Sequence, residues 1–151
     1  MKKIMLPILI VQILVCIGCS DNVSLKGRVT FSDDGSPVSS GTVCFVTDTF
    51  QARGNLDSGG YYSVGTTGTS NGLPLGTYKV FIADAKKQTG TKKVIREEID
   101  KDSGETKSIE VDDPVLEELV DPKFNNAETS GLTVEVKSST KFNFTVDRFK
   151  P

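Results

Sequence analysis

The chain of 151 residues contains no histidine and no tryptophan, and it has only three cysteines. Without histidine it cannot form a Ser–His or Cys–His nucleophilic site, and it lacks the commonest metal ligand in proteins. No phosphate-binding P-loop or dinucleotide-binding glycine fingerprint occurs either. The net charge of −2, without a strongly basic cluster, argues against a nucleic-acid partner. We therefore expect a non-enzymatic protein with no cofactor and no bound metal.

Two pairs of adjacent aspartates, Asp33–Asp34 and Asp112–Asp113, remain as candidates for acid–base chemistry. Paired carboxylates can hydrolyse glycosidic bonds. However, the first pair lies in "SDDGSP", which has the composition of a turn, and the second pair precedes Pro114, where a helix could begin. We expect turn formation and helix capping from these residues. Calcium binding by the first pair is disfavoured because the spaced oxygen ligands of a recognised calcium loop are missing.

The first 18 residues have the composition of a secretory leader. Two lysines precede the apolar run "IMLPILIVQILVCIG", which is shorter than the roughly 20 residues of a membrane-spanning helix. An A-x-A-like cleavage pattern is absent, and Ile17 and Gly18 directly precede Cys19. This order resembles the bacterial lipobox, whose cysteine is lipidated before cleavage, although Cys16 stands where leucine is usual. We predict a signal peptide over residues 1–18, lipidation of Cys19 and a short tether over 19–22.

Lipidation of Cys19 predicts a protein anchored in the cell envelope. Bacterial lipoproteins of this kind carry three acyl chains, and two or more chains anchor a protein stably whereas one does not. Ser20, and not aspartate, follows the cysteine, which favours the outer over the inner membrane. The alternative is an ordinary signal peptide in which Cys19 has no special role.

Cys44 has no partner once Cys16 has been removed with the leader and Cys19 has been acylated. An intramolecular disulfide is therefore excluded in the mature chain. Cys44 lies in the strand-like run "GTVCFVT", where apolar residues occupy both faces. Such a strand is usually central or covered, so we predict a buried, reduced thiol with a structural role.

From residue 23 onward, apolar and polar residues alternate in short runs separated by turn residues, a pattern typical of strands. The runs predicted to be strands are "SLKGRVTF", "GTVCFV", the polar edge "QARGNLD", "YYSV", "TYKVFIAD", "GLTVEVK" and "KFNFTVD". Only "SST" separates the last two, which predicts a hairpin. About seven short strands predict one all-β antiparallel sandwich over residues 23–151. The side chains predicted to point into its core are Val29, Phe45, Val80, Val134 and Phe144.

Two segments interrupt the strand pattern. Residues 86–113 are dense in charges of both signs without a strict period, which predicts a solvated loop or a frayed hairpin inserted between strands. "PVLEELV", from Pro114, predicts one short helix that Pro122 would stop.

The order of several motifs resembles the transthyretin-like (prealbumin-like) sandwich of carboxypeptidase regulatory-like domains in bacterial lipoproteins. The segments that carry this resemblance are "LKGRVTFSDDGSPVSSGTVCFV", "NGLPLGTYKVFIAD" and "LVDPKFNNAETSGLTVEVKSSTKFNFTV". Within them, the matching positions are Gly35, Pro37, Gly41, Val43, Phe45, Gly76, Tyr78, Val80 and Ser130 to Thr133. The resemblance implies a seven-stranded Greek-key sandwich and an accessory, folding or binding role. It carries over no catalytic residues, and a fold alone does not establish a function.

The sequence thus predicts a non-enzymatic cell-envelope lipoprotein that binds a protein or glycan partner or acts structurally at the membrane surface. The alternative is a carbohydrate-binding module or a carboxylate-dependent hydrolase accessory of an envelope polysaccharide or peptide system. Tyr61, Tyr62 and Tyr78 could provide a sugar-binding platform, but tyrosines in strands more often pack in the core.

Overall fold

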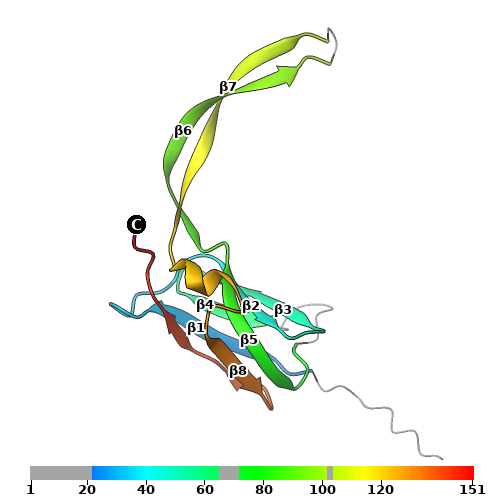
Figure 1. Cartoon of the computed structure of the whole chain (residues 1–151), viewed down its shortest axis with the longest axis vertical. Helices are drawn as coiled ribbons and strands as arrows, with labels where there is room; N and C mark the ends of the chain where they lie inside the picture. The colour runs from blue at the N-terminus through cyan, green and yellow to red at the C-terminus, as the bar shows by residue number, and fades with distance from the viewer. Residues whose placement is uncertain (1–21, 65–71, 102–103) are drawn as a thin grey trace, which may run out of the picture.

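The computed structural model describes residues 22–64, 72–101 and 104–151. Two four-stranded sheets pack face to face and a long two-stranded ribbon projects from them (Figure 1). The predicted all-β sandwich is confirmed. The signal peptide over 1–18, lipidated Cys19 and most of the tether lie outside the described residues.

The first sheet has the order β10-β1-β4, with β9 also pairing with β1. The second sheet has the order β3-β2-β5-β8, so the polar strand β3 lies at its edge as predicted. The strands of the first sheet are β1 (Leu25–Phe31), β4 (Tyr61–Val64), β9 (Thr140–Lys141) and β10 (Phe144–Val146). Those of the second are β2 (Thr42–Val46), β3 (Gln51–Asn55), β5 (Gly76–Ala83) and β8 (Leu132–Val136).

The core lies between the two sheets and is built by the strand alternation. Along β1, for example, Leu25, Val29 and Phe31 are buried on one face. Of the five predicted core residues, Val29, Phe45, Val80 and Val134 are buried. Phe144 packs against the core but is only partly buried, because β10 is a short edge strand of the first sheet.

The predicted hairpin between the last two strands is wrong. β8 pairs antiparallel with β5 in one sheet, whereas β10 pairs parallel with β1 in the other, with Val29 opposite Phe144. The chain between them therefore crosses from sheet to sheet, and β9 begins the pairing with β1 on the way. Apolar alternation fixes which face of a strand is buried, but both strands of this pair could satisfy it against different neighbours.

The predicted helix from Pro114 is also wrong. Residues 114–118 continue strand β7 (Thr106–Glu118), which pairs along its length with β6 (Lys86–Ile99). The one helical turn in the described residues is the 3₁₀ turn η1 (Pro122–Asn125). Pro122 starts this turn and does not stop a helix, since Asp121 caps it by accepting a bond from the Lys123 N–H at 2.9 Å. The turn buries Phe124.

Cys44 is buried in β2, as predicted. The strand is central, between β3 and β5, and the residues opposite Cys44 are Arg53 and Phe81. Burial raises the pKa of the Cys44 thiol above its ordinary value. Both burial and the raised pKa favour the protonated thiol.

Candidate functional site

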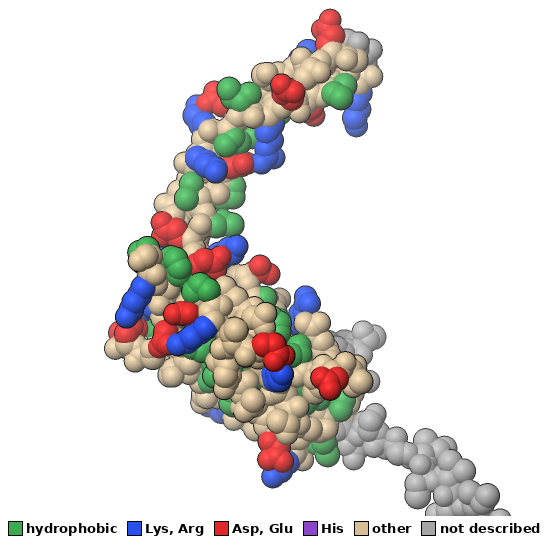
Figure 2. Space-filling model, viewed as in Figure 1, with side chains coloured by type: hydrophobic (Ala, Val, Ile, Leu, Met, Phe, Trp, Pro, Cys, Tyr) green, Lys and Arg blue, Asp and Glu red, His purple; other side chains and the backbone are tan. Residues whose placement is uncertain are grey.

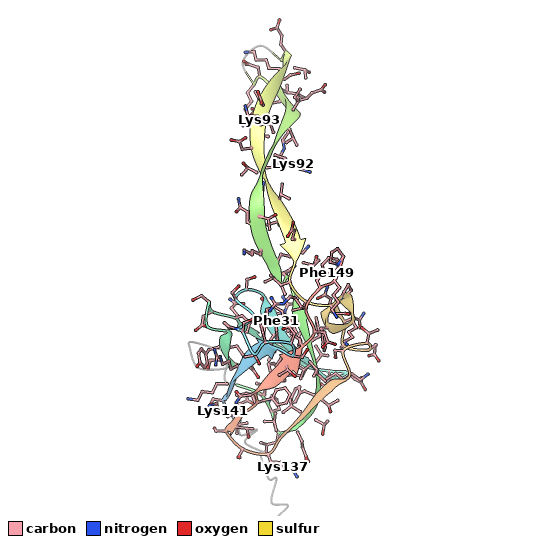
Figure 3. The ribbon with its side chains drawn as sticks, turned by 90° about the vertical axis from the view of Figure 1, so that its left-hand side faces the viewer. Phe31, Lys92, Lys93, Lys137, Lys141 and Phe149 are labelled. Carbon is pink, nitrogen blue, oxygen red and sulfur yellow. The ribbon has the colours of Figure 1, made fainter. Side chains whose placement is uncertain are left out.

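The β6–β7 ribbon is the most prominent surface feature of the protein. β6 has 14 residues, so at about 3.4 Å per residue it is roughly 45 Å long. Figures 1 and 3 show that the ribbon extends beyond the sandwich with neither face covered by another described element. An isolated two-stranded hairpin is marginally stable in water. A ribbon of this length that no other described element covers is therefore a candidate interaction surface.

The hydrogen-bond register of the ribbon identifies which backbone groups are free. At the distal end the Asp100 N–H donates to the Glu105 carbonyl at 2.9 Å, and at the base the Leu119 N–H donates to the Ala85 carbonyl at 2.8 Å. Because antiparallel bonds alternate along a strand, even-numbered residues of β6 bond to β7 beyond the bulge. The N–H and C=O groups of odd-numbered residues from Thr91 to Ile99 point away from β7, along the free edge of β6.

The two free edges of the ribbon differ. By the same alternation, the free edge of β7 carries its even-numbered residues, which include Glu110, Asp112 and Pro114. Proline has no N–H and is tolerated in a sheet where that position faces away from the ladder. Proline and charge at an edge discourage the addition of another strand. The free edge of β6 has no proline between its bulge at Gln88/Gly90 and Ile99.

One face of the ribbon is partly shielded by its own side chains. Val94 and Val111 face each other across the strands and are half-buried. Arg96 donates to Asp113 at 2.5 Å, and in this register the ion pair spans the Val94–Val111 rung. An arginine stem can cover apolar surface while its head stays solvated. The Arg96–Asp113 ion pair therefore covers part of this face.

The opposite face exposes apolar side chains. Ile95 is 76% exposed and Ile99 is 67% exposed, the two largest values among the exposed large hydrophobic residues described. Figure 2 shows hydrophobic side chains along the ribbon between charged ones. On this face Lys93 forms an ion pair with Glu110 at 2.9 Å. Exposed isoleucines beside an open strand edge are typical of an interaction surface.

Four charged residues of β6 take part in no salt bridge among the described residues: Lys87, Lys92, Glu97 and Glu98. Their side chains are exposed. They are free to pair with charges supplied by a partner.

The predicted carboxylate candidates are not brought together. Asp33 and Asp34 lie in the turn after β1, near Phe31, whereas Asp112 and Asp113 face Lys93 and Lys92 on the ribbon (Figure 3). Neither ribbon aspartate caps a helix, since both belong to β7. The expectation of helix capping there is wrong because the segment is a strand.

The first pair serves the turn, as predicted. Asp34 accepts bonds from the N–H and the hydroxyl of Ser36 at 2.8 and 2.6 Å, and these bonds hold the pKa of its carboxyl below the ordinary value. Arg148 donates to Asp33 and Asp34 at 3.1 and 3.0 Å, and its guanidinium lies 3.8 Å from the centre of the Phe31 ring. These contacts fasten the C-terminal segment to the sandwich.

The tyrosines do not form a common platform. Tyr62 and Tyr78 are buried, and their hydroxyls donate to the carbonyls of Phe142 and Pro74, each at 2.7 Å. Burial raises the pKa of both phenols. Tyr61 alone is exposed, and the Arg28 guanidinium lies 5.0 Å from its ring centre. The three rings are therefore divided between the core and the surface.

A hollow of about 260 Å³ lies at the edge of the first sheet. Small-molecule sites usually measure roughly 300–1,000 Å³ and are largely apolar. Its lining residues are Arg28, Thr30, Asn143, Phe144 and Thr145. This small, mixed surface is a weaker candidate than the ribbon.

Within the described residues, no group of three or more histidine, cysteine, aspartate or glutamate side chains could hold a metal ion. In the same part of the chain, no helix is long and apolar enough to span a membrane.

The sequence predicts a charged insert over residues 86–113, as a solvated loop or a frayed hairpin, but does not identify an ordered site there. The order of charges on the two sides of the turn could have indicated the hairpin. Lys92 and Lys93 face Asp113 and Asp112, so opposite charges lie at equal distances from the turn. The Val94–Val111 pair continues the same register toward the turn. Residues equidistant from a turn pair in a hairpin, and opposite charges at such positions stabilise it.

Comparisons with known proteins give no family. No protein-family model matches the chain, and no curated protein matches it. Among solved structures, a 9R-lipoxygenase from Cyanothece PCC8801 is similar over 85% of this chain, with 13% identity and a TM-score of 0.36. The major pilin subunit of Bacillus cereus is similar over 85% of this chain, with 14% identity and a TM-score of 0.33. The chain spans only 17% and 30% of their lengths, and similarity this low supports no functional argument.

Proposed function

We propose that the protein is a non-enzymatic lipoprotein of the cell envelope that uses the β6–β7 ribbon as an arm to bind a protein partner. The observation that carries this proposal is the open edge of β6, which combines unpaired backbone groups with the exposed Ile95 and Ile99. Strand addition to such an edge is a common mode of protein recognition. The sandwich serves as the base that holds the arm.

The anchoring part of the proposal is supported by the sequence at the start of the chain. Positive charge, a short apolar run and Gly18 before Cys19 are the parts of a lipoprotein leader. Acyl chains on Cys19 would keep the arm at a membrane surface, and Ser20 favours the outer membrane. Confinement to a surface raises the local concentration of a partner in the same envelope.

We also propose that the sandwich belongs to the transthyretin-like group. The order of the motifs from Gly35 to Thr133 supports this assignment. Gly35 and Gly41, two positions of the motif, have φ values of +71° and +123°. These conformations favour glycine, which gives a physical reason for glycine at both places.

The experiment that tests the arm is site-specific photo-crosslinking of the full-length protein in its own cells. A photoreactive residue placed at Ile99 on the ribbon should give a discrete adduct of higher mass. The matched control is the same residue at Lys137, which is exposed on the sandwich after β8 and away from the ribbon (Figure 3). Absence of a discrete adduct from Ile99, or equal adducts from both positions, would show that the ribbon is not the binding arm.

A further inference from the structure

The free edge of β6 has a defined usable length. It begins after the bulge between Gln88 and Gly90 and ends where the strand ends at Ile99. Thr91–Ile99 is therefore the regular stretch, and Ile95 is its central residue. The Ile95 N–H and C=O point outward, because odd-numbered residues here face away from β7.

The charges on either side of Ile95 are arranged with opposite signs. Lys92 and Lys93 precede it, and Glu97 and Glu98 follow it. Reversing the direction of the strand therefore exchanges positive for negative. Such a strand is complementary in charge to an antiparallel copy of itself.

We propose that two copies of the protein associate through antiparallel pairing of their β6 edges, with Ile95 of each copy opposite Ile95 of the other on a two-fold axis. This inference rests on the proposed function and deepens it, since it identifies the partner of the arm as a second copy of the chain. The two ribbons become one four-stranded sheet, with a sandwich at each end. The interface is isologous, the commonest arrangement in homodimers.

The register brings opposite charges together on both faces of the new sheet. On one face Lys93 lies opposite Glu97 of the second copy, and on the other face Lys92 lies opposite Glu98 of the second copy. The symmetry repeats each pair, so four complementary pairs form. Opposite charges directly across an antiparallel pair are stabilising, and like charges are destabilising.

Other registers are worse. Outward-facing residues must lie opposite outward-facing residues. One strand can therefore slide along the other only so that the sum of the two residue numbers in each pair changes in steps of two. One such shift places Lys92 opposite Arg96 of the second copy, and the other places Arg96 opposite itself. Pairing through the β7 edge, centred on the Glu110 that faces Ile95, would put Glu110 opposite itself and would include Pro114, which lacks an N–H. The charge pattern therefore selects both the edge and the register.

The pairing also covers apolar surface that the single chain leaves in water. Ile95 meets its own copy at the centre, and Ile99 meets Thr91 of the second copy at either end. Burial of these side chains stabilises the four-stranded sheet, whereas a two-stranded ribbon alone is only marginally stable.

Charge reversal provides a test with an internal rescue. One full-length variant carries Lys92→Glu and Lys93→Glu, and a second carries Glu97→Lys and Glu98→Lys. Each is repulsive toward itself in the proposed register, but the two are complementary to each other. Differently tagged full-length chains are purified in detergent, alone and together, and their association is measured by co-purification.

Each variant alone should lose self-association by at least about tenfold, because four attractive pairs become repulsive. Together, the two variants should associate about as well as two unchanged chains. Misfolded variants could not rescue one another, so restored association is specific to the pairing. Undiminished self-association, or loss without rescue, would overturn the proposal.

A disulfide provides an independent readout of the register. In the full-length protein Ile95→Cys should cross-link to a dimer under a mild oxidant, since paired residues in a ladder lie about 5.5 Å apart at Cα. Cys44 is buried and does not compete. The control is Leu116→Cys, which is also exposed but lies on β7. A monomer in both cases, while Ile99 still cross-links to a different protein in cells, would refute the dimer and leave the binding arm intact.

Discussion

Arg96 on β6 binds Asp113 on β7 at 2.5 Å across the rung formed by Val94 and Val111. The contact is diagonal, which fits the twist of a two-stranded ribbon. It joins the strands by a side-chain link and shields the two valines from water. The β6–β7 ribbon is therefore stabilised by ion pairing as well as by its backbone hydrogen bonds.

Asp113→Ala should loosen the ribbon without unfolding the sandwich. An exposed ion pair contributes about 1 kcal/mol or less, so amide exchange in β6 and β7 should rise by no more than about fivefold. The matched control is Asp112→Ala, which removes a neighbouring carboxylate that forms no salt bridge among the described residues. The two variants are compared by hydrogen exchange in dilute detergent. Equal effects would show that the Arg96–Asp113 ion pair does not stabilise the ribbon.

The two core phenylalanines should respond differently to truncation. Phe45 is fully buried, so Phe45→Ala should lower the free energy of unfolding by about 3–5 kcal/mol. Phe144 is only partly buried, so Phe144→Ala should cost roughly half as much. Urea denaturation of both variants measures the difference. A larger loss from Phe144→Ala would mean that β10 contributes more to the core than its exposure indicates.

The sandwich was predictable because burial of one strand face leaves a period of two in the sequence. Val29, Phe45, Val80 and Val134 all lie on the predicted side. Which strands pair with one another is harder to predict. The apolar–polar alternation of β8 and β10 fits a hairpin between them as well as it fits strands in two separate sheets. The structure separates them, and the parallel β1–β10 pairing has no local signal in the sequence.

The ribbon is hard to predict for a different reason, and the sequence supports a frayed hairpin over residues 86–113 no better than a solvated loop. It has no deep core, so its strands show no sustained apolar period, and their pairing appears only in residues mirrored about the turn. The segment "PVLEELV" predicts a helix because proline suits a first helical turn. In a two-stranded ribbon the same proline is tolerated at a free edge, which the sequence alone does not identify.

Cys44 should react slowly with thiol reagents in the native protein. It is buried, and burial raises the pKa of its thiol, so little thiolate is present at neutral pH. The neutral Cys44 thiol contributes fully to the stability of the fold below the ordinary thiol pKa. This contribution is lost as the pH rises through the raised pKa that the thiol has in the folded protein. Cys44→Ala should fold with a loss of about 1 kcal/mol. Labelling of native Cys44 as fast as of unfolded protein would contradict this account.

Mature protein from cells should begin with an acylated Cys19. Mass spectrometry of the N-terminal peptide should show the added acyl mass, and Cys19→Ser should abolish it and release the protein from membranes. The expected control is Cys16→Ser, which should leave lipidation unchanged because residue 16 is removed with the leader. An unmodified N-terminus at Cys19 or Ser20 would refute the lipid anchor.

The most direct measurement of the central claim, that the β6 edge is a binding edge, is residue-resolved amide exchange of the full-length protein in its own membranes. Lys93, Ile95 and Glu97 have N–H groups on the free edge, whereas the N–H groups of Val94 and Arg96 bond to β7. The account predicts slow exchange at all five positions in membranes. In detergent, at a protein concentration too low for association with a partner, only the three edge residues should become fast. Fast exchange of Lys93, Ile95 and Glu97 in membranes, with Val94 and Arg96 still protected, would show that the edge has no partner and would contradict the claim.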